Sequence, residues 1–214
     1  MKTDELVALL AKGAGPVEQD AAARRFIGVL GWGMFGTALA MVLTMRMRSD
    51  IAEAMLLPMF WIKLAFPSAV AIATYTVVTR LGRPGKRLGL TPGTTLVALL
   101  MAVWMLAIAT LFNAAPAERS HLVLGDTWLF CLVSIPLLSI PVFVAAMRAM
   151  KELAPTRLSL AGGAAGLFAG AASAAVYSLH CTEMEAPFLA IWYVLGMSIP
   201  AIAGAAIGPR LLRW

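Results

Sequence analysis

The chain has 214 residues, of which 61% are hydrophobic and 13% charged, and its mean hydropathy is +0.85. This composition excludes an ordinary soluble domain, because one helix across the ~30 Å bilayer core needs only roughly 20 apolar residues. The net charge of +6 also fits a nucleic-acid-binding protein. However, the basic residues are spread over short segments between apolar runs, which favours a membrane-topology signal and no direct contact with nucleic acid.

Six runs of about membrane-spanning length predict an all-α, polytopic membrane protein with a bundle of six transmembrane helices. We expect residues 1–25 to form a cytoplasmic N-terminal segment and residues 26–214 to form the transmembrane domain. Lys63, just before the second charge-free run, is expected to extend toward the outer interface. The runs are Phe26 to Met45, Leu64 to Thr79 with an extension back to about Met59, Thr94 to Phe112, Thr127 to Met147, Leu158 to Leu179 and Pro187 to Ile207.

The distribution of Lys and Arg predicts that both termini are cytoplasmic. With an inward N-terminus, all but four of the 17 Lys and Arg residues fall on the cytoplasmic side. The four exceptions are Arg46, Arg48, Lys63 and Arg119.

The N-terminal segment contains a short amphipathic pattern. Asp4 follows a threonine at a plausible helix start, where an acidic side chain is favourable. Leu6, Val7, Leu9 and Leu10 then share one apolar face at helical spacing. A helix of about two turns is marginal alone in water, so it either folds when it binds a partner's groove or remains a frayed tail. The residues alone leave both interpretations open.

The two cysteines are predicted to lie near the outer membrane face. Cys131 is about 5 Å inside the start of the fourth run, and Cys181 lies in the turn between the fifth and sixth runs. They could form a disulfide if their Cα atoms come within about 7 Å. With His180 they could transiently hold a soft heavy-metal ion, which Glu183 could complete. Two packed, unpaired thiols are the third interpretation, and no permanent cofactor is expected.

Gly162, Gly166 and Gly170 stand four residues apart and predict a face that another helix can approach closely. Packing within one bundle is one use of this seam, with Gly204 and Gly208 as a matching surface. A homodimer is the other.

The sequence gives no sign of catalysis. It has no phosphate-binding loop and no nucleophile elbow, so we expect no enzyme and no catalytic residue. Mid-membrane Asp, Glu, Arg and His are absent, which argues against ion-coupled transport. A transporter for a small molecule or metal ion, and a structural scaffold, remain as alternative functions.

Four segments resemble the NrsF-like family of bacterial inner-membrane proteins: Met1 to Leu10, Leu57 to Pro67, His180 to Phe188 and Gly208 to Trp214. The resemblance covers the whole chain. It implies an inner-membrane anti-sigma factor that holds an extracytoplasmic-function sigma factor through the N-terminal segment. It further implies that the cysteines take part in sensing the envelope stress that frees the sigma factor. From the residues themselves, we expect that stress to be a redox change or the capture of a heavy-metal ion.

Overall fold

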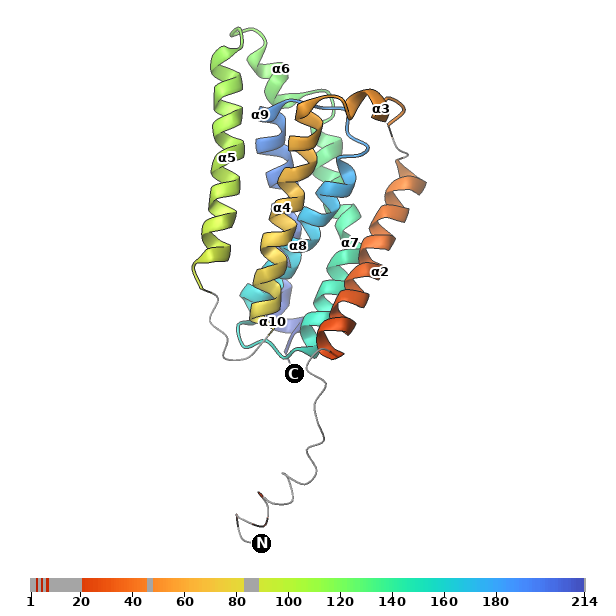
Figure 1. Ribbon diagram of the computed structural model, residues 1–214, viewed down its shortest axis with the longest axis vertical. Coiled ribbons are helices and arrows are strands. Elements are labelled where there is room, and N and C mark those ends of the chain that lie inside the picture. The colour runs from red at the N-terminus through yellow and green to blue at the C-terminus, as the bar shows by residue number, and fades with distance from the viewer. Residues whose placement is uncertain are drawn as a thin grey trace.

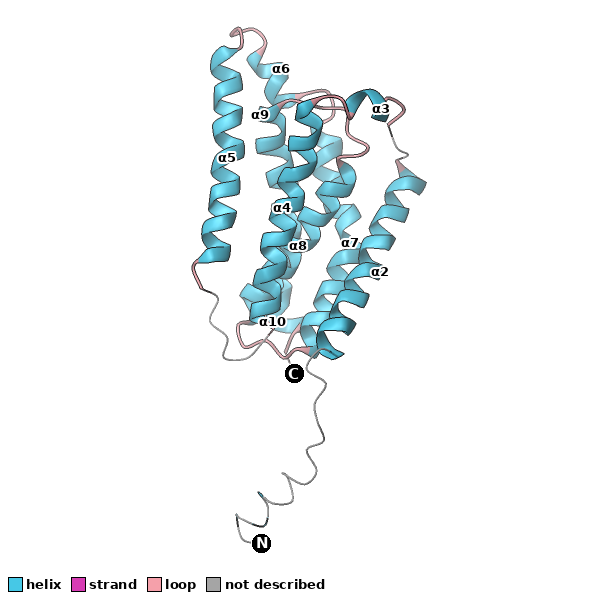
Figure 2. Cartoon of the chain, in the orientation of Figure 1, coloured by secondary structure: helices cyan, strands magenta, loops and turns pink. Residues whose placement is uncertain are grey.

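The computed structural model describes residues 3, 5, 7, 21–45, 48–82 and 89–213, and of 21–26 the backbone alone. The described part of the chain is helical, with no strands (Figure 2). Its elements in chain order are α2 (Ala21–Thr44), α3 (Ile51–Ala54), α4 (Pro58–Leu81), α5 (Thr91–Asn113), α6 (Arg119–Leu124), α7 (Trp128–Glu152), α8 (Leu158–Tyr177), α9 (Ala186–Phe188), the π-helix η1 (Leu189–Tyr193) and α10 (Val194–Leu211).

Among the described residues, six helical segments are long and apolar enough to cross a membrane, which confirms the predicted number of spans. They are α2, α4, α5, α7, α8 and the continuous α9–η1–α10 segment. The short helices α3, α6 and α9 lie at one end of the bundle, and α2 begins and α10 ends at the other (Figure 1). We refer to these as the α6 end and the α2 end.

The second span begins within one residue of the extension predicted back to about Met59. Helix α4 starts at Pro58. A proline fits there because N–H groups in the first turn have no acceptor within the helix, so the missing N–H of proline costs no hydrogen bond. Lys63 therefore lies within the span, one to two turns from its start.

Helix α8 is the centre of the bundle and packs against α4, α7 and α10. Its glycine seam faces α10 of the same chain: a Cβ atom on Gly162 would overlap the carbonyl oxygen of Gly204, and one on Gly166 would overlap that of Pro200. A Cβ atom on Gly170 would lie 2.8 Å from the Met197 carbonyl oxygen. Of the two uses predicted for this seam, the structure shows packing within one bundle, because α10 occupies the glycine face.

Helix α7 contains Pro136 and Pro141, yet continues through both. Hydroxyl groups from neighbouring helices donate to main-chain carbonyl oxygens near these prolines, a kind of contact by which membrane helices tolerate proline. The Thr37 hydroxyl of α2 donates to the carbonyl oxygen of Leu138 at 2.8 Å, and that of Ser173 in α8 donates to Ile135 at 3.0 Å.

Candidate functional site

Both cysteines are buried at the α6 end of the bundle. Cys131 lies in the first turn of α7 and is fully buried, and Cys181 lies just after α8 with 3% of its surface exposed. Both are free thiols, and they belong to one hydrophobic cluster that also contains Tyr177 and Tyr193. The structure thus brings the two predicted sensor cysteines, one in α7 and one in the loop after α8, into the same cluster. It leaves them unbonded.

Lys63 of α4 lies against this cluster, with only 2% of its surface exposed. Its ammonium group donates to the carbonyl oxygens of Cys181 at 2.7 Å and Glu183 at 2.5 Å. It also lies 5.7 Å from the centre of the Tyr193 ring, within the range of a cation–π contact. The expectation that Lys63 extends toward the interface is corrected: the loop after α8 folds over it and supplies the polar groups that water would otherwise provide.

A second cation contacts the same loop. Arg48 donates from Nη1 to the carbonyl oxygen of Cys181 at 3.4 Å. Its remaining donors form a two-point contact with the carboxylate of Asp50, at 2.7 and 2.6 Å. This hydrogen-bonded ion pair lowers the pKa of Asp50 to about 2 and raises the pKa of Arg48. Asp50 therefore stays ionised at neutral pH and helps to position the guanidinium beside Cys181.

Glu183 joins the loop to the start of α7. Its Oε1 atom accepts hydrogen bonds from the main-chain N–H of Asp126 at 2.9 Å and from the Thr127 hydroxyl at 3.3 Å. A negative charge is favourable here because the helix dipole is positive at an N-terminus. Gly125 makes room for this contact: it has a φ of +55°, and a Cβ atom on it would lie 2.8 Å from the Glu183 Cδ. The carboxylate of Glu183 thus holds the start of α7 in place. The main-chain carbonyl oxygen of the same residue accepts the hydrogen bond from Lys63.

His180 packs its ring against two aromatic rings, with centroids 5.9 Å from Phe130 and 5.8 Å from Tyr177. Within the described residues, no group of three or more His, Cys, Asp or Glu side chains has an arrangement that could hold a metal ion. The metal set proposed from sequence, Cys131, Cys181 and His180, therefore gains no support from the arrangement of these side chains.

The N-terminal residues proposed to bind a partner are mostly not described. Asp4, Leu6, Leu9 and Leu10 lie outside the described residues. Val7 has helical backbone geometry, and 60% of its surface is exposed.

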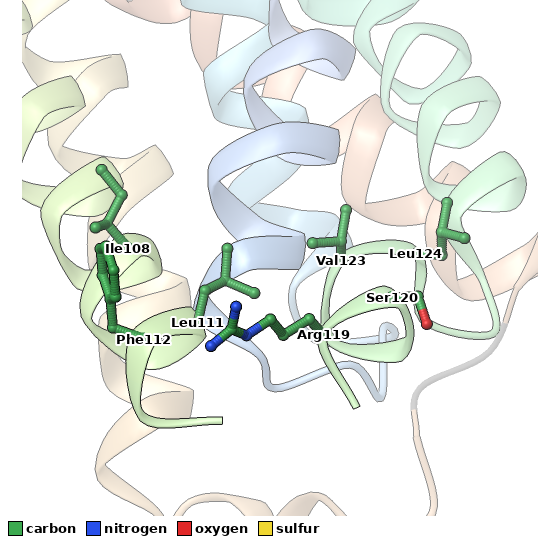
Figure 3. Close-up of a pocket in the computed structure, with 7 residues that line it drawn as sticks. All are labelled: Ile108, Leu111, Phe112, Arg119, Ser120, Val123 and Leu124. Carbon is green, nitrogen blue, oxygen red and sulfur yellow. The ribbon is translucent and has the colours of Figure 1, made fainter. Parts of the chain in front are cut away.

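A separate groove of about 520 Å³ opens between the end of α5 and α6, and Arg119 is its one charged lining residue (Figure 3). Ile108, Leu111 and Phe112 form its α5 wall, and Val123 and Leu124 contribute from α6. None of the predicted site residues lines it.

Sequence reasoning missed Lys63 and Arg48 as members of the site. Lys63 had one usable signal, since it is a charge within the backward extension of an apolar run. Arg48 had none, because its contact with Cys181 spans 133 positions of the chain.

These features define a class: an all-helical protein with six segments able to span a membrane and a cluster of buried thiols at one end. The chain matches the family described as "Negative regulator of sigma F" over residues 10–214, and it belongs to this family.

Two curated relatives match over the full length of both chains. The chain is 48% identical over 214 residues to a probable anti-sigma-F factor NrsF of Azospira oryzae. It is 36% identical over 220 residues to the anti-sigma-F factor NrsF of Caulobacter vibrioides. No solved structure matches the chain. The family is regulatory, and the anti-sigma role inferred from sequence is supported.

Proposed function

We propose that this protein is an inner-membrane anti-sigma factor with both termini in the cytoplasm. It binds a sigma factor of the extracytoplasmic-function type through its N-terminal segment. The observation that carries this proposal is the full-length similarity to two relatives that are named anti-sigma-F factors. The apolar positions of the segment support it, since Val7 is helical and exposed, as a docking face must be before its partner binds.

Removing the N-terminal segment tests where the sigma factor binds. We expect a variant lacking residues 1–20, which leaves α2 intact, to lose co-purification of the sigma factor from detergent-solubilised membranes. The substitution Leu6→Asp should weaken recovery at least about tenfold, since burying an unpaired carboxylate at an interface costs more than 1.4 kcal/mol. Lys12→Gln is the matched control and should bind normally. Equal recovery from the full chain and the truncated variant would exclude the segment as the binding site.

We further propose that Cys131 and Cys181 report envelope stress. Their shared cluster allows a change at one sulfur to disturb the other. A redox change at the sulfurs, or heavy-metal capture there, would shift the helices that carry them. The bundle would then release the sigma factor.

Serine substitutions test this role. Cys131→Ser and Cys181→Ser should each leave basal repression intact and reduce induction of sigma-dependent transcription by a thiol-reactive stress. Ser134→Ala, a buried change one turn from Cys131, is the matched control. Normal induction in both cysteine variants would reduce the thiols to packing residues. Uptake of a metal ion into proteoliposomes that contain the purified protein would instead favour the transporter alternative.

A further inference from the structure

The buried ammonium group of Lys63 requires an explanation that membrane anchoring does not give. A charged side chain within a membrane span is costly unless it is paired and hydrogen-bonded. Here the compensation comes from two main-chain carbonyl groups of the loop after α8 and from the aromatic ring of Tyr193. A methionine would fill a similar volume without this cost, so the charge does more than fill space.

The contacts of Lys63 converge on the residue that carries a sensor thiol. The carbonyl oxygen of Cys181 accepts hydrogen bonds from both Lys63 and Arg48, and the carbonyl of Glu183 binds the same Lys63 ammonium. The loop from Cys181 to Glu183 is thereby fixed to α4. The Cys181 side chain itself is 3% exposed and packed in the hydrophobic cluster. A group added to its sulfur must displace the side chains packed around it, so we expect the loop to move.

We propose that Lys63 is a positioning residue that links the chemical state of Cys181 to the packing of α4. Its ammonium group fastens the loop from Cys181 to Glu183 onto α4, and an adduct on the Cys181 sulfur breaks this fastening. This inference rests on the proposed function of the thiols as sensors, and adds the residue through which a reaction at the sulfur changes the bundle.

The path from this fastening to the opposite end of the bundle is continuous packing between α4 and α8. Near the loop, Phe66 and Val70 share a cluster with Ala174. Toward the α2 end, Val78 and Leu81 share a second cluster with Ala161. Close-packed interfaces tend to switch between arrangements rather than deform gradually. Releasing the loop from α4 therefore changes the α4–α8 contact as a unit, up to the end where α2 begins.

Hydrogen–deuterium exchange of the full chain in lipid nanodiscs tests the proposal. The probe is N-ethylmaleimide, which forms an S–C bond to Cys181 as its own C=C bond is consumed and the thiol proton passes to the neighbouring carbon. Exchange is followed in residues 178–188, and mass spectrometry identifies which cysteine is alkylated. In the unmodified wild type these amides should be protected. Alkylation of Cys181 should speed their exchange about tenfold, the effect of losing one charge-assisted hydrogen bond.

Substitutions at Lys63 separate fastening from simple packing. Lys63→Met should show the fast exchange without alkylation, and alkylation should then add little. Lys63→Arg retains the charge and should restore protection and the response to alkylation. Lys63→Gln, neutral but still a donor, should be intermediate, and it decides the question if the methionine variant does not fold. Lys151→Met removes an exposed lysine at the opposite end and is the matched control.

Two results would overturn the proposal. One is wild-type protection of residues 178–188 in Lys63→Met or, if that variant does not fold, in Lys63→Gln. The other is an equal gain in exchange on alkylation with and without the lysine charge. The exchange measurement needs no sigma factor, so it separates this inference from the proposed function. Fast exchange of residues 178–188 in Lys63→Met, combined with unchanged sigma-dependent transcription in that variant, would contradict the sensing role and retain the fastening.

Discussion

The ion pair of Arg48 and Asp50 gives the site a pH dependence outside the membrane-spanning segments. The pKa of Asp50 falls from its ordinary value of 3.8 to about 2 in the folded protein. A depressed carboxyl pKa contributes stability that is fully present above the unfolded pKa and lost as the pH falls through the folded value. The contribution is therefore present above about pH 4 and disappears toward pH 2. Because Asp50 is exposed, this contribution to stability is small and is screened by salt.

This pair predicts a specific behaviour of Asp50→Asn. The melting temperature of the variant should lie slightly below that of the wild type above about pH 4, and the two should converge as the pH approaches 2. Thermal unfolding in detergent between these pH values measures the difference, and high salt should reduce it. A constant offset across the range would mean that the carboxylate charge does not stabilise the fold. Glu118→Gln, which changes another exposed carboxylate at the α6 end, is the matched control.

At this scale the sequence predicted which thiols share a membrane level, but not their surroundings. The level of Cys131 and Cys181 follows from their distance to the ends of apolar runs. The burial of Lys63 does not follow from the sequence, because its hydrogen-bond acceptors lie 118 and 120 positions away along the chain. A lysine near the start of a span can extend toward the membrane surface or be buried under a loop, and the sequence fits both. Only the path of the loop after α8 decides between them.

At the scale of helices, hydropathy predicted the six spans and spacing predicted the glycine seam, because both are local properties of the sequence. The helix that packs on the seam cannot be read from local sequence, since a face of small residues fits a neighbouring helix and a second copy of the chain equally well. The π-helix η1 was also unexpected. It places Tyr193, whose hydroxyl is buried without a well-formed hydrogen bond, against the ammonium of Lys63. A single π-helical turn leaves no pattern in the sequence when the whole run is apolar.

The close contact of α8 with α10 predicts a severe effect of Gly166→Val. Its Cβ atom would overlap the backbone of Pro200, which cannot move aside as a flexible side chain would. We expect a loss of at least about 1–3 kcal/mol in stability, the usual cost of overpacking, or failure to accumulate in the membrane. Gly31→Ala in α2 is the control, because a Cβ atom there has no neighbour within 4 Å. Thermal unfolding of the two purified variants makes the comparison; equal stability would contradict the close helix contact.

For the whole molecule, the proposed regulation depends on which end of the bundle faces the cytoplasm. The connection between α5 and α6 lies at the α6 end, and that between α7 and α8 lies at the α2 end (Figure 1). Both Ala117 and Thr156, in these two connections, are exposed, so each can carry an introduced cysteine. Both variants also carry Cys131→Ser and Cys181→Ser, so the native thiols contribute no background.

In intact cells, a membrane-impermeant maleimide should label Ala117→Cys and leave Thr156→Cys unlabelled. A permeant maleimide should label both, which controls for the reactivity of each site. This result would place the thiol cluster toward the periplasm, where an external oxidant arrives first, and the start of α2 toward the cytoplasmic sigma factor. The reverse labelling pattern would put the N-terminal segment on the wrong side of the membrane. Sequestration through that segment would then be impossible, whatever the behaviour of Lys63 and the thiols.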